Sequence, residues 1–248
     1  MSLGDYSCAL VTGASSGIGR AVAERLAERG LEVHATARRQ DRLAALADET
    51  GCVAHALDLR DRAAVEAAFE DLEIDIVVNS AGIGLGFSAL YRAAPEDIET
   101  TLDTNVLGTA RVLRRVLPGM VARSRGHVVN IGSIFGLHAI GSTVYGASKG
   151  AIHLLSQNLR LELQGTGIRV SEVCPGRAAT EFLEVAAAGD AARAAAMRAD
   201  FEILTAADVA DAVLYVLDAP WRVNVSLIEL TATEQVPGGA SIVPVSKD

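Results

Sequence analysis

Short apolar runs alternate along this chain with stretches in which apolar residues recur at helical spacing. The runs, each predicted to be a buried strand, are Cys8–Thr12, Val33–Ala37, Val53–Leu57, Ile74–Asn79, His127–Ile131, Arg169–Val173 and Val225–Leu230. The helical stretches between them are Gly17–Arg29, Asp41–Glu49, Arg62–Leu72, Pro95–Val121, Val144–Leu163 and Ala206–Leu217. Repeated strand–helix–strand units predict right-handed crossovers. We therefore expect an α/β fold in which residues 1–248 form one domain, with a doubly wound, seven-stranded parallel sheet and helices on both faces.

The alternative architecture is an eight-unit (β/α) barrel, but it would not explain a glycine cluster directly after the first apolar run. Two segments interrupt the alternation: Gly132–Thr143 follows the fifth run and Pro175–Ile203 follows the sixth. Both are expected at the carboxyl ends of strands, where open α/β sheets bind ligands. Residues 177–203 are rich in alanine and are the candidate substrate lid, with an ordinary surface insertion as the alternative.

Composition limits the class of protein. The chain has a formal net charge of −9 and no run rich in lysine or arginine, which excludes the basic footprint of a nucleic-acid-binding protein. No apolar run approaches the roughly 20 residues of a membrane span. The cysteines Cys8, Cys52 and Cys174 and the five histidines have no metal-ligand spacing. We expect a soluble, cytoplasmic protein with reduced cysteines, no metal site, and no nucleic-acid or membrane partner.

A glycine cluster follows the first predicted strand and opens the first predicted helix. It reads Thr12-Gly13-Ala14-Ser15-Ser16-Gly17-Ile18-Gly19. Glycines at this position allow a tight turn and a close backbone approach to a pyrophosphate over the helix N-terminus. The cluster indicates a dinucleotide site because it lies between a strand and a helix.

The glycine cluster resembles that of the short-chain dehydrogenase/reductase family, and other motifs extend the resemblance from about Ala9 to Thr231. Residues 79–82 resemble the family's NNAG motif, with Ser80 replacing the second asparagine. The other positions at which the chain matches the family are Asp58, Asn105, Ser133, Tyr145-x₃-Lys149 and Pro175-Gly176. The resemblance implies a Rossmann-type, NAD(P)-binding oxidoreductase. Stretches such as ATARRQDRL and GIRVSEVCPG are similar to the subgroup of 3-hydroxy acid and serine dehydrogenases.

The resemblance also implies which residues hold the cofactor. The cofactor-binding residues are expected to be Gly13, Ser15, Ser16, Gly17, Ile18, Gly19, Arg38, Arg39, Asp58, Leu59, Asn79, Ala81, Gly82, Tyr145, Lys149, Pro175, Gly176 and Thr180. Asp58 would bond the adenine amino group and Asn79 would lie along the adenine ribose, while Thr180 would contact the nicotinamide carboxamide. The alternative for Asp58 is a helix N-cap before Arg62.

The end of the second strand bears on the choice of dinucleotide. NAD-binding members of the family carry a carboxylate at the position that aligns with Ala37, where it bonds the ribose 2′-hydroxyl. Here Arg38 and Arg39 follow instead, and a guanidinium pairs well with phosphate oxygens. Solvated surface charge is the alternative for both arginines. The sequence favours NADP over NAD.

Tyr145 and Lys149 are four residues apart on a predicted helix and therefore share a face. A free tyrosine has a pKa near ~10. A nearby ammonium and an oxidised nicotinamide ring are expected to lower it, so that Tyr145 serves as the acid/base. Ser133 would bond the substrate oxygen. Asn105, as the resemblance implies, would hold a water that completes a proton relay, with a tolerated polar residue on an exposed helix face as the alternative.

These residues predict an enzyme that transfers a hydride between nicotinamide and a secondary alcohol or ketone. The alternative is a catalytically silent NADP-binding sensor. A small 3-hydroxy acid and a hydroxy amino acid are both possible substrates, in a pocket expected to be mainly apolar with Arg177 as one candidate anchor for an anionic group. The family resemblance and the apolar surface of the two longest predicted helices indicate a homotetramer.

Overall fold

The structure is a computed structural model that describes residues 2–70, 72–85, 89–187, 202–236, 238–239 and 242–243. Its central feature is a seven-stranded sheet in the order β3-β2-β1-β4-β5-β6-β7, in which every neighbouring pair is parallel. The strands are β1 (Cys8–Thr12), β2 (Glu32–Ala37), β3 (Val53–Ala56), β4 (Ile76–Asn79), β5 (Gly126–Ile131), β6 (Ile168–Pro175) and β7 (Leu227–Leu230). The predicted seven-stranded parallel sheet is confirmed.

The order of the strands reverses between β1 and β4. The chain moves outward from β1 to β2 and β3, and then returns to place β4 on the other side of β1. The loops that follow β1 and β4 therefore leave the sheet in opposite directions. Such a reversal creates a crevice at the carboxyl ends of the strands, where doubly wound folds bind their ligands.

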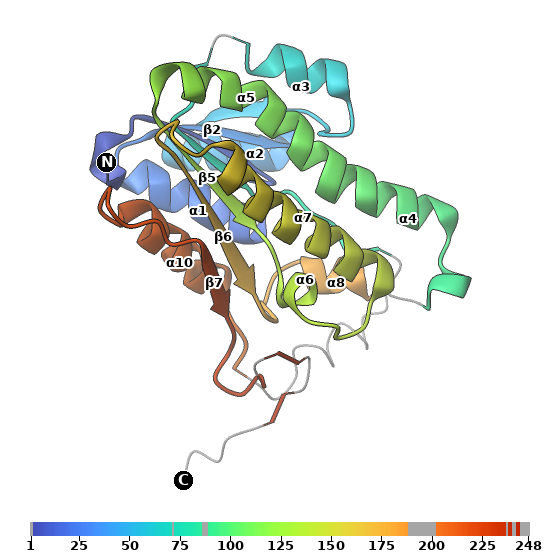
Figure 1. The fold of residues 1–248 in the computed structure, drawn as a ribbon. Coiled ribbons are helices and arrows are strands. Elements are labelled where there is room, and N and C mark those ends of the chain that lie inside the picture. The colour runs from blue at the N-terminus through green and yellow to red at the C-terminus, as the bar shows by residue number, and fades with distance from the viewer. Residues whose placement is uncertain are drawn as a thin grey trace.

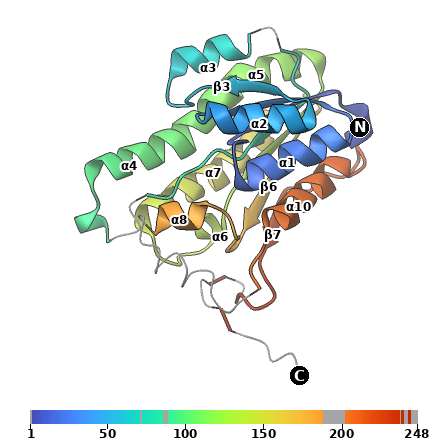
Figure 2. The same cartoon turned by 180° about the vertical axis from the view of Figure 1, so that it is seen from behind.

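Helices cover both faces of the sheet. One face carries α1 (Gly17–Glu28), α2 (Gln40–Thr50) and α10 (Ala206–Asp218), as Figure 2 shows. The other face carries α3 (Arg62–Ala68), α4 (Pro95–Leu102), α5 (Thr109–Arg123) and α7 (Thr143–Glu162), which lie in front in Figure 1. With both faces covered, each central strand is buried on both sides, and this explains its continuous apolar sequence.

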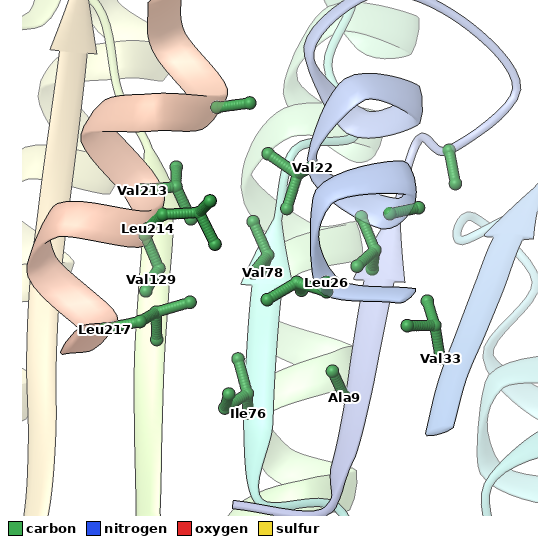
Figure 3. Packing of buried hydrophobic residues seen from close by; sticks show 14 of the residues in the cluster. Ala9, Val22, Leu26, Val33, Ile76, Val78, Val129, Val213, Leu214 and Leu217 are labelled. Atoms are coloured by element: carbon green, nitrogen blue, oxygen red, sulfur yellow. The ribbon is translucent and has the colours of Figure 1, made fainter. Parts of the chain in front are cut away.

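Alternate residues of each strand supply the two halves of the core. In β1, Ala9 belongs to the cluster under α1 and α10, whereas Leu10 belongs to the cluster under α3, α5 and α7. Figure 3 shows the first cluster, to which Leu26 of α1, Leu217 of α10 and Ile76 of β4 all contribute. The core is mainly aliphatic, as the low aromatic content predicts.

Side-chain caps define where two of the helices begin. Asp61 caps α3 by accepting a hydrogen bond of 3.0 Å from the backbone nitrogen of Ala64. The alternative reading of Asp58 as this N-cap is therefore wrong. Thr205 begins α10 through a capping box with Asp208, in which each side chain bonds the other residue's backbone nitrogen.

The structure divides the long predicted helix Pro95–Val121. A π-helical segment, η3 (Asp103–Gly108), separates α4 from α5. The shorter elements are η1 (Leu3–Asp5), η2 (Leu90–Arg92), α6 (Ile134–Leu137) and α8 (Phe182–Ala186). Figure 1 shows α6 and α8 beyond the arrowhead of β6, at the carboxyl end of the sheet. The segment predicted as loop after β5 thus contains a short helix. Residues 188–201 of the candidate lid lie outside the described residues.

Two further findings concern membrane-spanning helices and the cysteines. Among the described residues, no helix combines the length and apolar character needed to cross a membrane. Cys8, Cys52 and Cys174 are free thiols and all three are buried, as expected for small apolar side chains.

Candidate active site

A cavity of about 370 Å³ opens at the carboxyl ends of the strands, beside the reversal of strand order. The loop after β1, helices α6 and α7, and the segment after β6 surround it. The predicted site residues that line it are Gly13, Ser15, Ser16, Gly17, Ile18, Gly19, Arg38, Arg39, Asp58, Leu59, Ala81, Gly82, Ser133, Tyr145, Lys149, Pro175, Gly176 and Thr180. Folding therefore brings most of the predicted set to one place.

The glycine loop offers the cavity a surface of bare backbone. Gly13 has φ +70°, and a Cβ built on it would lie 2.8 Å from Cα of Ala81. A Cβ on Gly19 would lie 2.5 Å from the carbonyl oxygen of Gly13. Ala81 in turn donates its backbone N–H to Oγ1 of Thr12 at 3.1 Å, which holds the loops after β1 and β4 together. Only glycine fits these positions, and the resulting cradle at the N-terminus of α1 suits a pyrophosphate.

Arg39 connects the glycine loop to the segment after β6. Its guanidinium donates to Oγ of Ser15 at 2.9 Å and to Oγ of Ser16 at 2.6 Å, and it pairs with Glu181 at 2.8 Å. Arg42 pairs with the other carboxylate oxygen of Glu181. The two arginines lower the pKa of Glu181 to about 2. Glu181 and Arg42 escaped the sequence analysis, because nothing in their local sequence indicates a contact across more than a hundred residues.

Arg38 lines the same part of the cavity. Within the described ranges, its guanidinium makes no hydrogen bond or ion pair. Its charge helps to lower the pKa of Asp58, after the larger effect of a hydrogen bond from Arg60. Arg60 donates to the Asp58 carboxylate at 2.7 Å through one terminal nitrogen. Arg38 is thus a cation on the cavity wall whose hydrogen-bonding capacity is available to a ligand, whereas Arg39 is already engaged.

Ser133, Tyr145 and Lys149 line the same cavity as the glycine loop. Ser133 follows β5 and caps α6, with its Oγ 3.3 Å from the backbone nitrogen of Phe135. Tyr145 and Lys149 lie on α7, and Lys149 donates its Nζ proton to the carbonyl oxygen of Ile131 at 2.8 Å. Nζ is 5.9 Å from the centroid of the Tyr145 ring. The three side chains are buried, so their polar groups work in a medium of low dielectric constant.

Burial changes the ionisation of Tyr145 and Lys149. Desolvation raises the pKa of Tyr145 above its usual value, although a hydrogen bond with Ser133 opposes the change. The sequence-based expectation of a lowered pKa is therefore not met by the protein groups alone, because burial outweighs them. Desolvation lowers the pKa of Lys149 to about 8, and the negative charge of Glu172 partly opposes the change. At neutral pH the site holds a phenol beside an ammonium.

Aromatic rings enclose the Tyr145 side chain on both sides. The ring of Phe135 is 5.6 Å from the Tyr145 ring between centroids, and that of Phe182 on α8 is 5.1 Å away. Phe135 and Phe182 both line the cavity. The apolar lining expected from the sequence is thus present around the phenolic ring, and α8 brings the first part of the candidate lid against it.

Asn105 is buried within the π-helical segment η3 rather than on an exposed helix face, so that alternative is wrong. Its Oδ1 accepts the backbone N–H of Ile83 at 2.8 Å, and its Nδ2 donates to the carbonyl oxygen of Ile83 and to Oγ of Ser148. A Cβ on Gly82 would lie 3.5 Å from both Asn105 Oδ1 and Lys149 Nζ. Asn105 does not line the cavity, but it supports the wall beside Lys149. Inserted π-turns are frequent at functional sites.

A fully buried carboxylate lies behind the Ser133–Tyr145–Lys149 group. Glu172 of β6 accepts a hydrogen bond from Sγ of Cys174 at 3.2 Å and contacts Nδ1 of His153 at 2.8 Å. A Cβ on Gly132 would overlap the Glu172 carboxylate, so the carboxylate packs directly against the backbone that precedes Ser133. The sequence analysis missed Glu172, although a charged residue inside an apolar strand run was a usable signal.

Two polar side chains near the site lie outside the cavity wall. The Asn79 side chain does not line the cavity; it is buried in the sheet and donates to Oδ1 of Asn130 at 2.8 Å. This hydrogen bond bridges β4 and β5. The place of Asn79 along the adenine ribose stays a prediction. His138 contacts Glu229 at 2.9 Å and is not part of the cavity wall.

Arg177 lines the cavity and is half-buried. Its backbone nitrogen donates to Oε1 of Gln235 at 2.9 Å. Among the described residues no carboxylate pairs with its guanidinium, and burial lowers its pKa. Gln235 is a further lining residue that the sequence analysis missed, because it follows the last predicted strand and only the fold returns it to Gly176.

Known proteins resemble this chain over most of its length. The family model described as short chain dehydrogenase matches residues 7–191. The NADP-dependent 3-hydroxy acid dehydrogenase YdfG of Escherichia coli K12 is 41% identical over 94% of this chain and 98% of that protein. Sulfoacetaldehyde reductase 2 of Chromohalobacter salexigens is 39% identical over 91% of this chain and 94% of that protein. The solved closed form of a serine dehydrogenase complexed with NADP+ superimposes with a TM-score of 0.91 at 40% identity, covering 96% of this chain and 100% of that one.

The motifs, the fold and these relatives agree. The family model covers the glycine loop, Ser133, Tyr145 and Lys149, which the structure gathers around one cavity. The chain belongs to the short-chain dehydrogenase family.

Proposed function

We propose that this protein is an NADP-dependent oxidoreductase that interconverts secondary alcohols and ketones. The observation that carries the proposal is that Ser133, Tyr145 and Lys149 line the same cavity as the glycine loop. Relatives named NADP-dependent 3-hydroxy acid dehydrogenase support both the cofactor and the reaction class. A silent sensor would have no need of all three polar side chains, so the sensor alternative is not favoured.

The chain's own groups manage the proton. The phenol of Tyr145, kept protonated by burial, is suited to protonate the oxygen of a ketone as it is reduced. Ser133 donates a hydrogen bond to the same oxygen and holds it against the phenol. When the reaction runs toward oxidation of an alcohol, the positive charge of Lys149 favours the phenolate form of Tyr145. Asn105 supports the cavity wall beside Lys149, where the proton of Lys149 would be exchanged. NADPH, when bound, supplies the hydride.

The glycine cradle and the arginines fit NADP. The glycine loop would hold the pyrophosphate, and Asp58 with Leu59 would meet the adenine. Arg38 would pair with the 2′-phosphate, while Arg39 holds the side chains of Ser15 and Ser16 in place through its hydrogen bonds. No carboxylate stands at Ala37, where NAD would need one. Pro175, Gly176 and Thr180 would close over the nicotinamide.

The substrate we propose is a small 3-hydroxy acid or a hydroxy amino acid. Relatives are named 3-hydroxy acid dehydrogenase and serine dehydrogenase, and such substrates carry a carboxylate. Arg177 is a cation on the cavity wall without a carboxylate partner in the described chain. Its guanidinium is suited to bind a substrate carboxylate in two hydrogen bonds.

The test is a panel of alcohols and ketones with and without a carboxylate, assayed with NADP(H) and NAD(H). We expect turnover with NADP and a 3-hydroxy acid. Arg177→Ala should weaken kcat/KM for the carboxylate-bearing substrate by on the order of 30-fold or more, since such a contact typically contributes about 2–5 kcal/mol. Equal losses on a neutral secondary alcohol would remove Arg177 from substrate recognition. Binding of NADP without turnover of any member of the panel would favour the sensor.

We further propose that residues 1–248 act as one domain in a cytoplasmic homotetramer. Exposed leucines on the helical face support this, namely Leu102 of α4, Leu107 of η3, and Leu154 and Leu161 of α7. A second copy would cover this apolar surface. Light scattering at micromolar concentration should give four times the 25.8 kDa chain mass, and a 25.8 kDa particle would contradict the proposal.

A further inference from the structure

A cluster of metal-ligating side chains lies at the amino end of the sheet, far from the cavity. Cys8 begins β1, and Glu32 and His34 lie in β2. Cys8 and Glu32 are partners in the parallel register, and His34 lies on the same face of β2 as Glu32, two residues further on. One oxygen of Glu32, one ring nitrogen of His34 and the Cys8 sulfur all lie within 4.8 Å of one another.

The orientation of His34 is set by contacts at both ring nitrogens. Nε2 is 3.2 Å from Oε1 of Glu32, and Nδ1 is 2.8 Å from Nε2 of His55 on β3. His34 and Cys8 are buried, whereas Glu32 is exposed. Ligating histidines in metal sites are held in the same way, with the second ring nitrogen hydrogen-bonded to a neighbouring group. His55 provides this support, and the exposed side of Glu32 provides a path for an ion.

The spacing of the three groups suits a small tetrahedral ion. Bonds of about 2.0–2.3 Å from zinc to oxygen, nitrogen and sulfur place the ligand atoms roughly 3.3–3.7 Å apart. The distance of 3.2 Å between His34 Nε2 and Glu32 Oε1 is close to this range, and the Cys8 sulfur lies within 4.8 Å of a ligand atom of each residue. A thiolate, an imidazole and a carboxylate select Zn²⁺ over Mg²⁺ or Ca²⁺, which require oxygen ligands. The thiolate and the carboxylate together neutralise the ion.

The charged side chains near Cys8, Glu32 and His34 are bonded to other groups. Asp75 lies near Cys8, but its carboxylate is bonded by Ser7 and by Arg125. Arg123 is also near Cys8 and donates to the carbonyl oxygen of Ile74 at 2.7 Å. The positive charge of Arg123 opposes a cation, so the affinity should be moderate. A water would take the fourth ligand position, since three protein ligands and one water are a common zinc arrangement.

We propose that Cys8, Glu32 and His34 form a zinc site that clamps β1 to β2 at the end of the sheet opposite the active site. The site is independent of the proposed function, because its ligands are not part of the cavity wall. Its effect is on stability: an ion that binds the folded chain and not the unfolded one raises the melting temperature by mass action. Cross-strand ligands hold two strands at once, so the amino end of the sheet gains most.

The experiment uses the full chain freed of metal with a chelator. Co²⁺ serves as the probe because it replaces zinc and gives a visible absorption band when a thiolate binds it. We expect one equivalent of Co²⁺ per chain, with a thiolate band that one equivalent of Zn²⁺ abolishes. Zn²⁺ should also raise Tm in a calorimetric scan. Absence of the thiolate band in the wild-type chain would overturn the proposal, and the Glu32–His34–His55 contacts would then be a hydrogen-bonded chain only.

Variants locate the ligands. Cys8→Ser should remove the thiolate band, and His55→Gln should weaken Co²⁺ binding about 10- to 100-fold through loss of support for His34. Glu32→Gln is exposed and should fold normally while losing at least tenfold in affinity. Cys52→Ser and Cys174→Ser are the matched controls, each removing another buried cysteine, and both should retain the band. Loss of the band in Cys174→Ser with retention in Cys8→Ser would place the metal elsewhere and contradict the assignment.

Discussion

The two ends of the parallel sheet both bury polar side chains, but they use them differently. At the amino end, Asp75 is bonded by Ser7 and by Arg125, and the Arg169 guanidinium donates to the carbonyl oxygens of Leu217 and Ala219. Most of these polar atoms have their partners within the chain, although the Nε of Arg169 is buried without a hydrogen-bond partner among the described residues. At the carboxyl end, by contrast, the polar side chains of Ser133, Tyr145 and Lys149 line a cavity.

Lys149 and Tyr145 illustrate the difference. Among the described residues, Lys149 has one carbonyl oxygen as its hydrogen-bond partner, and burial lowers its pKa to about 8. Burial also raises the pKa of Tyr145. Burying ionisable groups with shifted pKa values is costly for folding, but it is useful for proton transfer. Buried polarity therefore does not mark function by itself; the mark is buried polarity that opens on a cavity and awaits a partner from outside the chain.

The largest effect of any substitution is expected at Tyr145, whose buried phenol faces the cavity. Tyr145→Phe should lower kcat by about 10²–10⁴-fold, because a positioned acid/base typically contributes that factor. NADP binding should be retained, since the ring and its contacts with Phe135 and Phe182 remain. Steady-state kinetics and cofactor titration measure the two effects. Tyr215→Phe, on the exposed side of α10, is the control and should leave kcat unchanged. A folded Tyr145→Phe variant with turnover within tenfold of wild type would remove Tyr145 from the mechanism.

Arg38 tests whether the cavity's free cations select the cofactor. Arg38→Asp should raise the Kd for NADP by on the order of 10- to 100-fold, as expected for a lost charge-assisted hydrogen bond. NAD should bind as well as before or better, because the new carboxylate can accept from its 2′-hydroxyl. Fluorescence titration of both cofactors measures the ratio. Arg29→Asp, at the far end of α1, is the matched control. If the wild-type chain already prefers NAD, the assignment of Arg38 is wrong.

Glu172 is buried in the sheet like the amino-end polar groups, but its charge acts on the catalytic Lys149. We expect its removal to change the pH profile of kcat. Its negative charge helps to keep Lys149 protonated. Glu172→Gln should therefore lower the pKa of Lys149 below about 8, so that kcat begins to fall at a lower pH as the ammonium is lost. The shift should be under about one pH unit, which changes kcat a few-fold near pH 8.

Two controls accompany this measurement. Glu162→Gln, exposed on α7, should leave the profile unchanged. His153→Gln removes a hydrogen-bond partner of the Glu172 carboxylate but leaves the charge of Glu172 in place. This variant should therefore shift the pH profile of kcat less than Glu172→Gln does. Circular dichroism checks that each variant folds. An unchanged profile in a folded Glu172→Gln variant would leave Glu172 with a packing role only.

The smallest effect is expected away from both ends. Thr205→Ala removes the N-cap of α10 and should lower the free energy of unfolding by about 1 kcal/mol. Values of kcat and KM should not change, because the helix supports the sheet and does not line the cavity. Urea unfolding measures the loss, and Thr205→Ser should restore it. A larger effect on kcat than on stability would show that α10 is coupled to the site.

The amino-acid sequence by itself determined the elements whose signals are local. The glycine loop could be predicted because its three glycines, the strand before it and the helix after it are contiguous. Tyr145 and Lys149 could be paired because four residues span one helical turn. The parallel sheet could be predicted because fully buried strands have continuous apolar sequences.

Only the tertiary structure decided which distant residues meet. The π-helical segment at Asp103–Gly108 has no periodic signature in the sequence, and it determines that Asn105 points to Ile83 and Ser148. Glu181 reaches Arg39 across the crevice. Cys8 meets Glu32 only through strand register. Local patterns specify elements through hydrogen bonding and burial within a few residues, whereas register and helix placement arise when the whole chain is folded around one core.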